Sequence, residues 1–598
     1  MSKASKKKRP CHEPSTDKAH SVRESDHHPA LQATLLFPIL IILFFSFAVY
    51  FNALYCDFVY DDMDQVVNNL SIKDIRNIPT FFSKGVWGFW MDPAKSNYYR
   101  PLMYVTYTFV YHLFGAKAWG FHLVNILFHC GVTVLVFLLS RKLLMDHRPS
   151  RSPADFIFPS VAAILFASHP IHTEAVTWIA GLPDVAFTFF YLLSFYLYTW
   201  SKTGVSGTYL FSVACFAVAA FFKEPALTLP IVLFAYDYVF REARTHFFDY
   251  AKRYVPYLMI GVGYLALRIH ALEKFAPHRE HLSLSAYQYV INVFPLFVQY
   301  LEKLIAPINL NTFHVLHPIS SLFELKGALS LMATVAFLIL IPIALKKKRV
   351  VFLGLLFVTV PLLPVLYIPV LGENSFAERY LYLPSVGYVI LLTAVLSWVK
   401  EKLPHMVRSA TVILIVLIGL YIVGTVNRNN IWKNNFVLWA DTVRKSPDSP
   451  FAHTALGNEY ASKGRLDMAI TEYQTALRLR PDYPDAHVNL GIVYRWRGQL
   501  DMAITEYQTA LRLRPKYADV HYNLGNAYAS KGQLDMAITE YQTALRLNPN
   551  YANAHFNLGV AYLRKGAVDM ARGEFETGLK ISPDNLKARQ ILNSIVSK

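Results

Sequence analysis

The hydrophobic pattern of the chain changes near residue 430. Between residues 33 and 426, apolar runs long enough to cross a bilayer alternate with short polar stretches. About eleven of these runs are expected to be membrane-spanning helices. They lie at 33–51, 119–140, 155–168, 184–200, 208–222, 226–240, 254–272, 327–345, 350–369, 380–399 and 409–426. The pattern predicts an all-α fold in which a polytopic helical bundle precedes a more polar domain.

Two other stretches are amphipathic or aromatic-rich. Residues 102–114 are expected to lie along the membrane surface, because the span that follows must end at Arg141 and Lys142 on the cytoplasmic side. Residues 285–305 belong to a long external loop. Their pattern fits an interfacial helix or a re-entrant one, and both readings stay open.

Basic residues cluster beside the apolar runs and account for the formal net charge of +17. Such clusters mark the cytoplasmic ends of spans, which favours a multi-pass membrane protein and argues against nucleic acid as a partner. Residues 1–30 are therefore expected to form a disordered cytoplasmic tail. An odd number of spans places the C-terminal domain on the opposite side of the membrane.

A repeat occupies the C-terminal domain, expected at residues 429–598. Gly457, Gly491, Gly525 and Gly559 are spaced by 34 residues, and the segment DMAITEYQTALRL recurs almost unchanged. This is the period of tetratricopeptide (TPR) repeats, and about four repeats with a cap at each end are predicted. TPR superhelices bind extended peptides in a concave groove. A spacer or an oligomerisation module fits the same pattern.

Ionisable residues gather at the predicted outer ends of the spans. An adjacent carboxylate pair beside a span indicates a functional site, although a solvated loop end or a helix N-cap is the plainer alternative. The residues in this group are Asp61, Asp62, Arg100, His169, His172, Glu174, Asp184, Lys223, Glu224, Glu378 and Arg379.

Carboxylates and arginines on one face beside lipid suit group transfer from a lipid phosphate. The arginines would hold the anionic leaving group, and a carboxylate would take the proton of an acceptor hydroxyl in a direct displacement. The sequence has no Gly-rich phosphate loop, which argues against a soluble nucleotide donor. Simpler roles also fit, since Arg379 could pair with a carboxylate, and Lys223 with Glu224.

The sequence does not indicate a metal site. His169, His172 and Glu174 lie close together, but their spacing differs from HExxH and Pro170 intervenes. Hydrogen bonding near a substrate is the favoured role for these residues. The four cysteines are widely spaced and show no zinc or disulfide pattern. We expect no tightly bound cofactor, and the sequence leaves a divalent metal requirement open.

Seven segments, in their order along the chain, resemble the transmembrane and TPR-repeat O-mannosyltransferases of the GT-C glycosyltransferase class. They are FVYDDMDQVVNN (58–69), YYRPL (98–102), FHLVNILFH (121–129), HPIHTEAVTWIAGLPD (169–184), KEPALTLP (223–230), PINLNTFH (307–314) and AERYLYLPSVGY (377–388). The resemblance runs from about residue 34 to the end of the chain. In one departure, Gly181 is followed by Leu182-Pro183-Asp184, where relatives often carry a basic residue, as in GRAD.

This resemblance implies a GT-C-like transmembrane domain over residues 31–428 and a polyprenyl-phosphate-linked sugar, mannose, as donor. It implies inverting transfer to Ser or Thr hydroxyls of a protein on the non-cytoplasmic side, catalysed by Asp61 and Asp62. Arg100 and Arg379 would bind the donor phosphate. A supporting place in the site is expected for His169, His172, Glu174, Asp184, Glu224 and Glu378.

The compartment and one competing function stay open at the level of sequence. The nearly identical repeats favour a bacterial inner membrane with undecaprenyl phosphate and a periplasmic array. An endoplasmic reticulum membrane with dolichyl phosphate and a lumenal array is the alternative. A non-enzymatic membrane-anchored TPR scaffold for protein assembly is the competing function, but it would not need carboxylates and arginines on one face.

Overall fold

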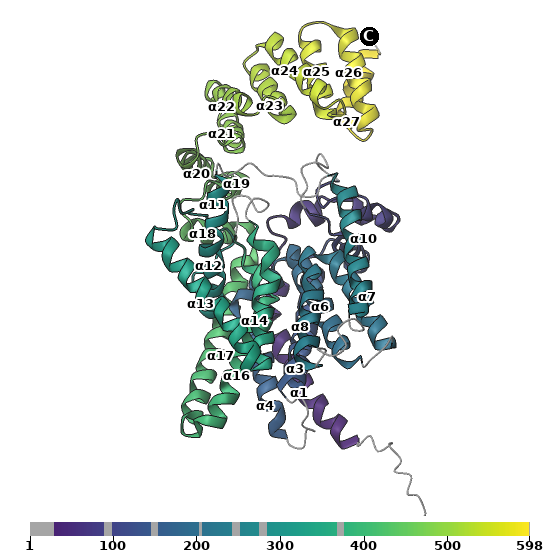
Figure 1. Cartoon of the computed structure of the whole chain (residues 1–598). Helices are drawn as coiled ribbons and strands as arrows, with labels where there is room; N and C mark the ends of the chain where they lie inside the picture. The colour runs from purple at the N-terminus through teal and green to yellow at the C-terminus, as the bar shows by residue number, and fades with distance from the viewer. Residues whose placement is uncertain are drawn as a thin grey trace, which may run out of the picture.

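The computed structural model describes residues 29–88, 98–144, 153–201, 206–241, 251–273, 284–367 and 376–596. Every regular element in these ranges is a helix. Figure 1 shows a bundle of long helices, from one end of which an array of shorter helices extends. The predicted all-α architecture, with a helical bundle followed by a TPR solenoid, is confirmed.

Each predicted span coincides with a helix. These helices are α1 (Pro29–Tyr50), α3 (Ala118–Leu144), α4 (Ile157–Ser168), α6 (Leu182–Trp200), α7 (Gly207–Phe222), α8 (Leu229–Phe240), α10 (Val255–Leu272), α13 (Leu325–Lys347), α14 (Arg349–Thr359), α16 (Pro384–Lys402) and α17 (Val407–Asn429). In the described part of the chain, seven helical segments are long and apolar enough to cross a membrane, and α4 and α7 are shorter apolar helices. The number of crossings stays a prediction.

Large apolar side chains cover the outside of the bundle. Phe37 and Phe44 on α1 are 69% and 76% exposed, and Ile413 and Leu420 on α17 are 67% and 64% exposed. A water-soluble domain does not leave so many large apolar side chains bare. Lipid is the surrounding that stabilises such a surface.

The amphipathic stretches are also helical. α2 (Pro101–Phe114) packs against the short helices η3 (Leu70–Lys73) and η4 (Ile75–Phe82) and against α7. Residues 285–305 form α11 (Ala286–Ile291) and α12 (Val293–Ile305), and α12 packs on α13. Their place relative to the membrane surface stays a prediction.

Short helices connect the long ones at the end of the bundle that holds the acidic pair. η7 (Pro170–His172), α5 (Thr173–Thr177) and η8 (Ile179–Gly181) lie between α4 and α6, and η13 (Glu378–Leu381) packs on η7 and α5. The chain turns back closely on itself at Gly181. A Cβ atom there would lie 2.4 Å from the Ala175 carbonyl oxygen, so only glycine fits.

The C-terminal array consists of helix pairs. They are α19 (Pro450–Ser462) with α20 (Leu466–Leu479), α21 (Pro484–Trp496) with α22 (Leu500–Leu513), α23 (Ala518–Ser530) with α24 (Leu534–Leu547), and α25 (Ala552–Arg564) with α26 (Val568–Ile581), flanked by α18 (Asn435–Lys445) and α27 (Leu586–Val596). The repeated glycine lets each pair pack closely, since a Cβ on Gly457 would lie 2.6 Å from the Tyr473 ring. The pairs match the predicted repeats and caps.

The array and the acidic pair lie at the same end of the bundle. The Tyr60 ring centroid lies 5.2 Å from that of Trp439 in α18 and 6.0 Å from that of Phe451 in α19. The start of α1 lies at the opposite end (Figure 1). The turn between α16 and α17 lies at that opposite end as well.

This arrangement predicts labelling from opposite sides of a membrane. In a Cys11→Ser background, Cys56, Cys130 and Cys215 are buried and should react slowly. Ser530→Cys in the array and Lys402→Cys in the α16–α17 turn should each react with a membrane-impermeant maleimide from one side only, and from opposite sides. Labelling of both positions from the same side would contradict the orientation.

Candidate active site

The acidic pair follows a residue in a strained backbone conformation. Tyr60 has φ of 55°, a left-handed conformation that costs a residue with a side chain about 1 kcal/mol. Its N–H donates to Asn435 Oδ1 at 2.7 Å, and its ring stacks on Trp178 at 5.6 Å. These contacts hold the turn that presents Asp61 and Asp62.

Asp62 anchors this turn to the bundle. The side chain is fully buried, and its two carboxylate oxygens accept hydrogen bonds from the N–H of Val59 at 3.0 Å and of Ala180 at 2.9 Å. Burial raises the pKa of Asp62, and the two backbone N–H donors oppose this rise. Asp62 therefore joins the loop after α1 to η8, two segments far apart in the sequence.

The segment that receives Asp62 is itself held by the bundle. The Trp178 carbonyl accepts from Asn125 Nδ2 at 2.8 Å, and the Ile179 carbonyl accepts from the Tyr107 hydroxyl at 3.0 Å. Thr177 Oγ1 donates to Asn429 Oδ1 at 2.8 Å. Residues 177–180 thus form a fixed platform beneath the acidic turn.

Asp61 is half-buried and lies in the same electrostatic environment as Arg100. Burial raises the pKa of Tyr104, and the negative charge of Asp61 adds to this rise whereas Arg100 opposes it. Burial also raises the pKa of Tyr60. The negative charge of Asp61 adds to this rise, and the positive charge of Arg379 opposes it. The Trp178 ring links the turn to Arg379 directly, because it stacks on Tyr60 at 5.6 Å and lies 5.3 Å from the Arg379 guanidinium.

Three cations converge around two tyrosine rings, and we call this group the cation cluster: Arg100, Lys223 and Arg379. The Arg100 guanidinium lies 4.4 Å from the centroid of the Tyr98 ring. Lys223 Nζ and the Arg379 guanidinium lie 4.7 Å and 5.0 Å from that of the Tyr380 ring. The buried Nε of Arg100 has no hydrogen-bond partner among the described residues, as expected for a group that awaits an anion.

Buried carboxylates hold two of these cations in place. Arg379 forms an ion pair with Glu174 through its guanidinium, and its backbone N–H donates to the same carboxylate at 2.9 Å. Lys223 forms an ion pair with Asp184, and both side chains are at most 3% exposed. Neither charge could stay in this apolar surrounding unpaired.

The carboxylates beside the cluster divide among its cations. Glu174 pairs with Arg379, and Asp184 pairs with Lys223. Glu224 lies 3.7 Å from Arg268 of α10, and its negative charge also acts on Arg100, where it opposes the effect of burial on the Arg100 pKa. An anionic group fits the region that Arg100 and Tyr98 border.

The pKa of Lys223 is sensitive to this crowding. The pKa of Lys223 is lowered from 10.5 to about 8, because burial and the positive charges of Arg100 and Arg379 together outweigh the opposing effect of Asp184. Lys223 therefore carries its charge below pH 8 and loses it as the pH rises above that value. The sequence analysis paired Lys223 with Glu224, and the structure replaces that partner with Asp184.

The predicted histidines lie beside the cluster as packing elements. His169 Nε2 bonds to the Leu304 carbonyl at 3.0 Å, and His172 Nε2 bonds to Ser385 Oγ at 2.7 Å. Both rings are fully buried. They join the α4–α6 connection to α12 and to the start of α16.

Glu378 belongs to a different group of charges. Its Oε1 lies 3.1 Å from His314 Nε2, and its Oε2 lies 3.8 Å from Arg428 of α17. Arg428 in turn pairs with Asp441 of α18 at 3.0 Å. Glu378 and Arg379 are adjacent in the chain but belong to different groups of charges. Glu378 lies at the junction with the array, and Arg379 belongs to the cation cluster.

Within the described ranges, no group of three or more His, Cys, Asp or Glu side chains is arranged to hold a metal ion. The sequence analysis missed three aromatic residues of the site: Tyr98, Trp178 and Tyr380. They lie in the segments YYRPL, HPIHTEAVTWIAGLPD and AERYLYLPSVGY, which also contain the charged residues predicted to form the site. Cation–π contact with a neighbouring arginine is the signal that could have found them.

The Asp184–Lys223 pair predicts a stability defect that a second substitution repairs. Asp184→Asn leaves the Lys223 charge buried without a partner and should lower the free energy of unfolding by about 3 kcal/mol. The double variant Asp184→Asn/Lys223→Met removes both charges and should recover most of the loss. Thermal unfolding in detergent, followed by tryptophan fluorescence, measures both. A single variant as stable as the wild type would contradict the role of the pair.

Known proteins resemble this chain in both of its parts. Family models described as TPR repeat and tetratricopeptide repeat match residues 457–495, 493–532 and 525–566, and residues 552–585, respectively. The structure of YrrB, described as a TPR protein with an unusual peptide-binding site, matches with a TM-score of 0.24 and 24% identity over 26% of this chain and 80% of that one. The predicted TPR repeats are confirmed by the family models.

Curated relatives extend the similarity into the bundle. The chain is 28% identical over 451 residues to a protein O-mannosyl-transferase of Caenorhabditis elegans, which covers 74% of this chain and 62% of that protein. It is 25% identical over 471 residues to the protein O-mannosyl-transferase TMTC3 of Homo sapiens, with coverage of 72% and 50%. The chain thus spans between half and two thirds of these relatives. These curated relatives are named protein O-mannosyl-transferases, as the resemblance implied.

Proposed function

We propose that the chain is an integral membrane glycosyltransferase. It transfers mannose from a polyprenyl-phosphate donor to a Ser or Thr hydroxyl of a protein, at the membrane face that carries the TPR array. The observation that supports this most directly is that the acidic turn and the cation cluster meet at Trp178, at the end of the bundle beside the array. The Tyr60 ring stacks on Trp178 at 5.6 Å, and the Arg379 guanidinium lies 5.3 Å from the centroid of the same ring. The names of the curated homologues point to the same activity.

The reaction is a direct displacement at the anomeric carbon. The acceptor hydroxyl oxygen forms a bond to that carbon while the bond from the carbon to the phosphate oxygen breaks, which inverts the configuration. Asp61 accepts the hydroxyl proton, a contribution of about 10²- to 10⁴-fold in rate for a positioned general base. The products are the O-mannosylated protein and the polyprenyl phosphate.

Asp61 and Asp62 divide this task. Both carboxylate oxygens of Asp62 are engaged by backbone N–H groups and the side chain is sealed from solvent, so Asp62 positions the turn. Asp61 lies one residue further out and is half-buried, where an acceptor can reach it. We therefore assign Asp61 as the base and Asp62 as the residue that orients it.

The cation cluster stabilises the leaving group. A phosphodiester with one negative charge becomes a monoester with up to two, so the charge that develops in the transition state is stabilised by the three cations of the cluster. Arg100 offers its unpartnered Nε, and Lys223 and Arg379 are fixed by their own carboxylates. Because these cations are already ordered, little rearrangement accompanies the reaction.

The TPR array would guide the acceptor protein. Phe451 of the first repeat contacts Tyr60, the residue before the base, and stacks on Phe313 at 5.1 Å. A peptide that leaves the groove of the array therefore reaches the acidic turn within a short distance. We place the reaction outside the cytoplasm, in a bacterial inner membrane with the array in the periplasm.

Removal of the base should abolish transfer without loss of the fold. Asp61→Asn should lower the rate of mannose transfer from a polyprenyl-phosphate donor to an acceptor peptide by at least about 10²-fold. Asp64→Asn is the matched control, because Asp64 is an exposed carboxylate in the same turn. Radiolabelled sugar incorporation measures both. Full activity of the Asp61 variant, or an equal loss in the control, would overturn the assignment.

The pKa of Lys223 predicts a pH dependence of donor binding. As the pH rises through about 8, Lys223 loses its proton and the cluster loses one positive charge, so the KM for the donor should rise. Lys223→Arg keeps a charge at every pH in this range and should hold the donor KM nearly constant up to about pH 9. Initial rates at varied donor concentration between pH 7 and pH 9 test this.

Lys531→Arg serves as the control for this measurement. Lys531 is paired with Asp501 on the outside of the array, so its variant should keep the wild-type pH profile. A profile that Lys223→Arg leaves unchanged would mean that another group sets the pH dependence.

A further inference from the structure

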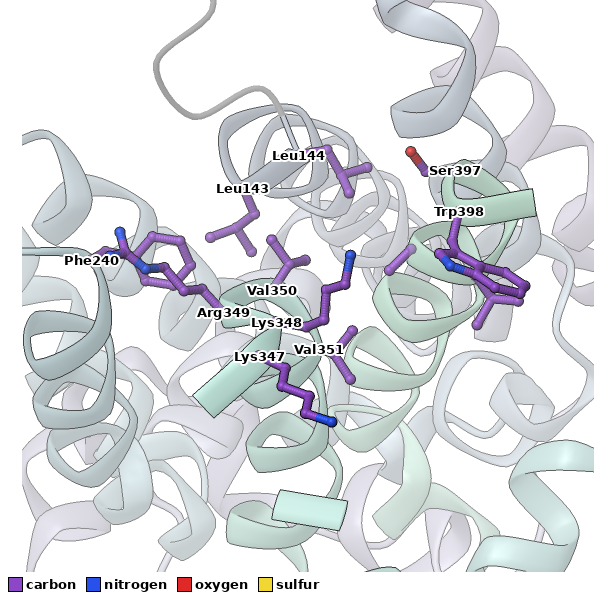
Figure 2. Close-up of a pocket in the computed structure, with 12 residues that line it drawn as sticks. Leu143, Leu144, Phe240, Lys347, Lys348, Arg349, Val350, Val351, Ser397 and Trp398 are labelled. Carbon is purple, nitrogen blue, oxygen red and sulfur yellow. The ribbon is translucent and has the colours of Figure 1, made fainter. Parts of the chain in front are cut away.

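A second charged site lies at the other end of the bundle, away from the array. A cavity of about 580 Å³ opens there between the ends of α3, α8 and α13, the start of α14, and α16. Its walls are mostly apolar, and three basic residues lie together at its rim: Lys347, Lys348 and Arg349. Figure 2 shows Lys347 and Lys348 between Phe240 on one side and Trp398 on the other. The proposed function does not use any of these residues.

The basic residues of this cavity lack acidic neighbours in the described part of the chain. None of the residues that line the cavity is acidic, and no ion pair joins Lys347, Lys348 or Arg349 to a described residue. Asp237, near the end of α8, is already paired with Arg241 at 3.3 Å. Three consecutive like charges repel one another, and an anion bound among them would relieve this repulsion.

The apolar walls indicate that this anion carries a hydrophobic part. Leu143, Phe240, Val351 and Trp398 line the cavity, and Trp398 remains 45% exposed. A free inorganic anion would gain nothing from these surfaces. An amphipathic ligand would place its charged group on the basic rim and its chains along the apolar wall.

The position of the cavity matches the level of lipid headgroups. At the same end of the bundle, Lys142 lies 4.2 Å from the centroid of the Trp200 ring, and Lys400 lies 5.4 Å from that of Phe158. Aromatic rings combined with lysines mark the boundary between hydrocarbon and water in membrane proteins. Basic pockets between spans at this level bind the headgroups of anionic lipids.

We propose that this cavity binds an anionic phospholipid from the leaflet opposite the array. The phosphate and headgroup lie on Lys347, Lys348 and Arg349, and an acyl chain runs between Phe240 and Trp398. This inference is independent of the transferase proposal, because the site and its ligand lie at the other end of the bundle.

Native mass spectrometry of the full chain tests the proposal. The protein is released from nanodiscs that contain equal amounts of phosphatidylglycerol and phosphatidylcholine, and the lipids that remain bound are counted. We expect phosphatidylglycerol to be enriched about 10-fold among the bound lipids of the wild type. Lys347→Gln/Lys348→Gln/Arg349→Gln should reduce this enrichment to near unity.

Two further variants separate the cavity from general surface charge. Lys400→Gln/Lys402→Gln/Arg408→Gln removes the same number of exposed charges from the same membrane face and should keep the enrichment. Ala394→Trp retains every charge but fills the cavity, and should lose the bound lipid. This second variant tests the site even where the triple substitution at the rim disturbs insertion.

Three outcomes would overturn the proposal. Equal retention of phosphatidylglycerol and phosphatidylcholine by the wild type would show that headgroup charge is not recognised. Displacement of the lipid by a large excess of inorganic phosphate would assign the site to a free anion. An equal loss of lipid in the Lys400/Lys402/Arg408 variant would show a diffuse surface effect in place of a site.

Discussion

The structure of the candidate site depends on one constraint, the cost of a charge away from water. The charged side chains of Arg379 and Lys223 can be buried in the bundle only because they form ion pairs with Glu174 and Asp184, respectively. The two ion pairs join η13 to α5 and the α7–α8 connection to the start of α6. Pairing thus fixes the relative positions of four segments, and those segments carry the cations that would meet a phosphate.

Pairing also explains why Arg100 differs from its neighbours. An arginine whose charge is matched by a buried carboxylate loses part of its affinity for an added anion. Arg100 instead lies over the ring of Tyr98 and is influenced by the more distant charges of Glu224 and Asp184. In the site, Lys223 and Arg379 are fixed by ion pairs with carboxylates, whereas the buried Nε of Arg100 has no hydrogen-bond partner among the described residues.

The sequence predicted the positions of the helices, because apolar runs and a 34-residue period are local signals. It also pointed to most of the charged residues of the candidate site. It could not predict which charges meet. Lys223 and Glu224 are adjacent in the chain yet pair with Asp184 and Arg268, since adjacent residues at a helix end point in different directions. Glu378 and Arg379 are also adjacent, and their side chains reach different groups of charges for the same reason. The different surroundings of Asp61 and Asp62 also required the fold, because the Ala180 N–H that donates to Asp62 is 118 residues away in the sequence.

The aromatic residues between the two halves of the site account for its placement beside the array. Trp178 lies 5.3 Å from the Arg379 guanidinium and stacks on Tyr60, and Tyr60 contacts Trp439 and Phe451. A shift of the first repeat would therefore move Tyr60, whose strained backbone is held by Asn435 of α18. Because Asp61 follows Tyr60 directly, the position of Asp61 depends on how the array docks on the bundle. The repeats are in this way part of the geometry of the acidic turn as well as a surface for a partner.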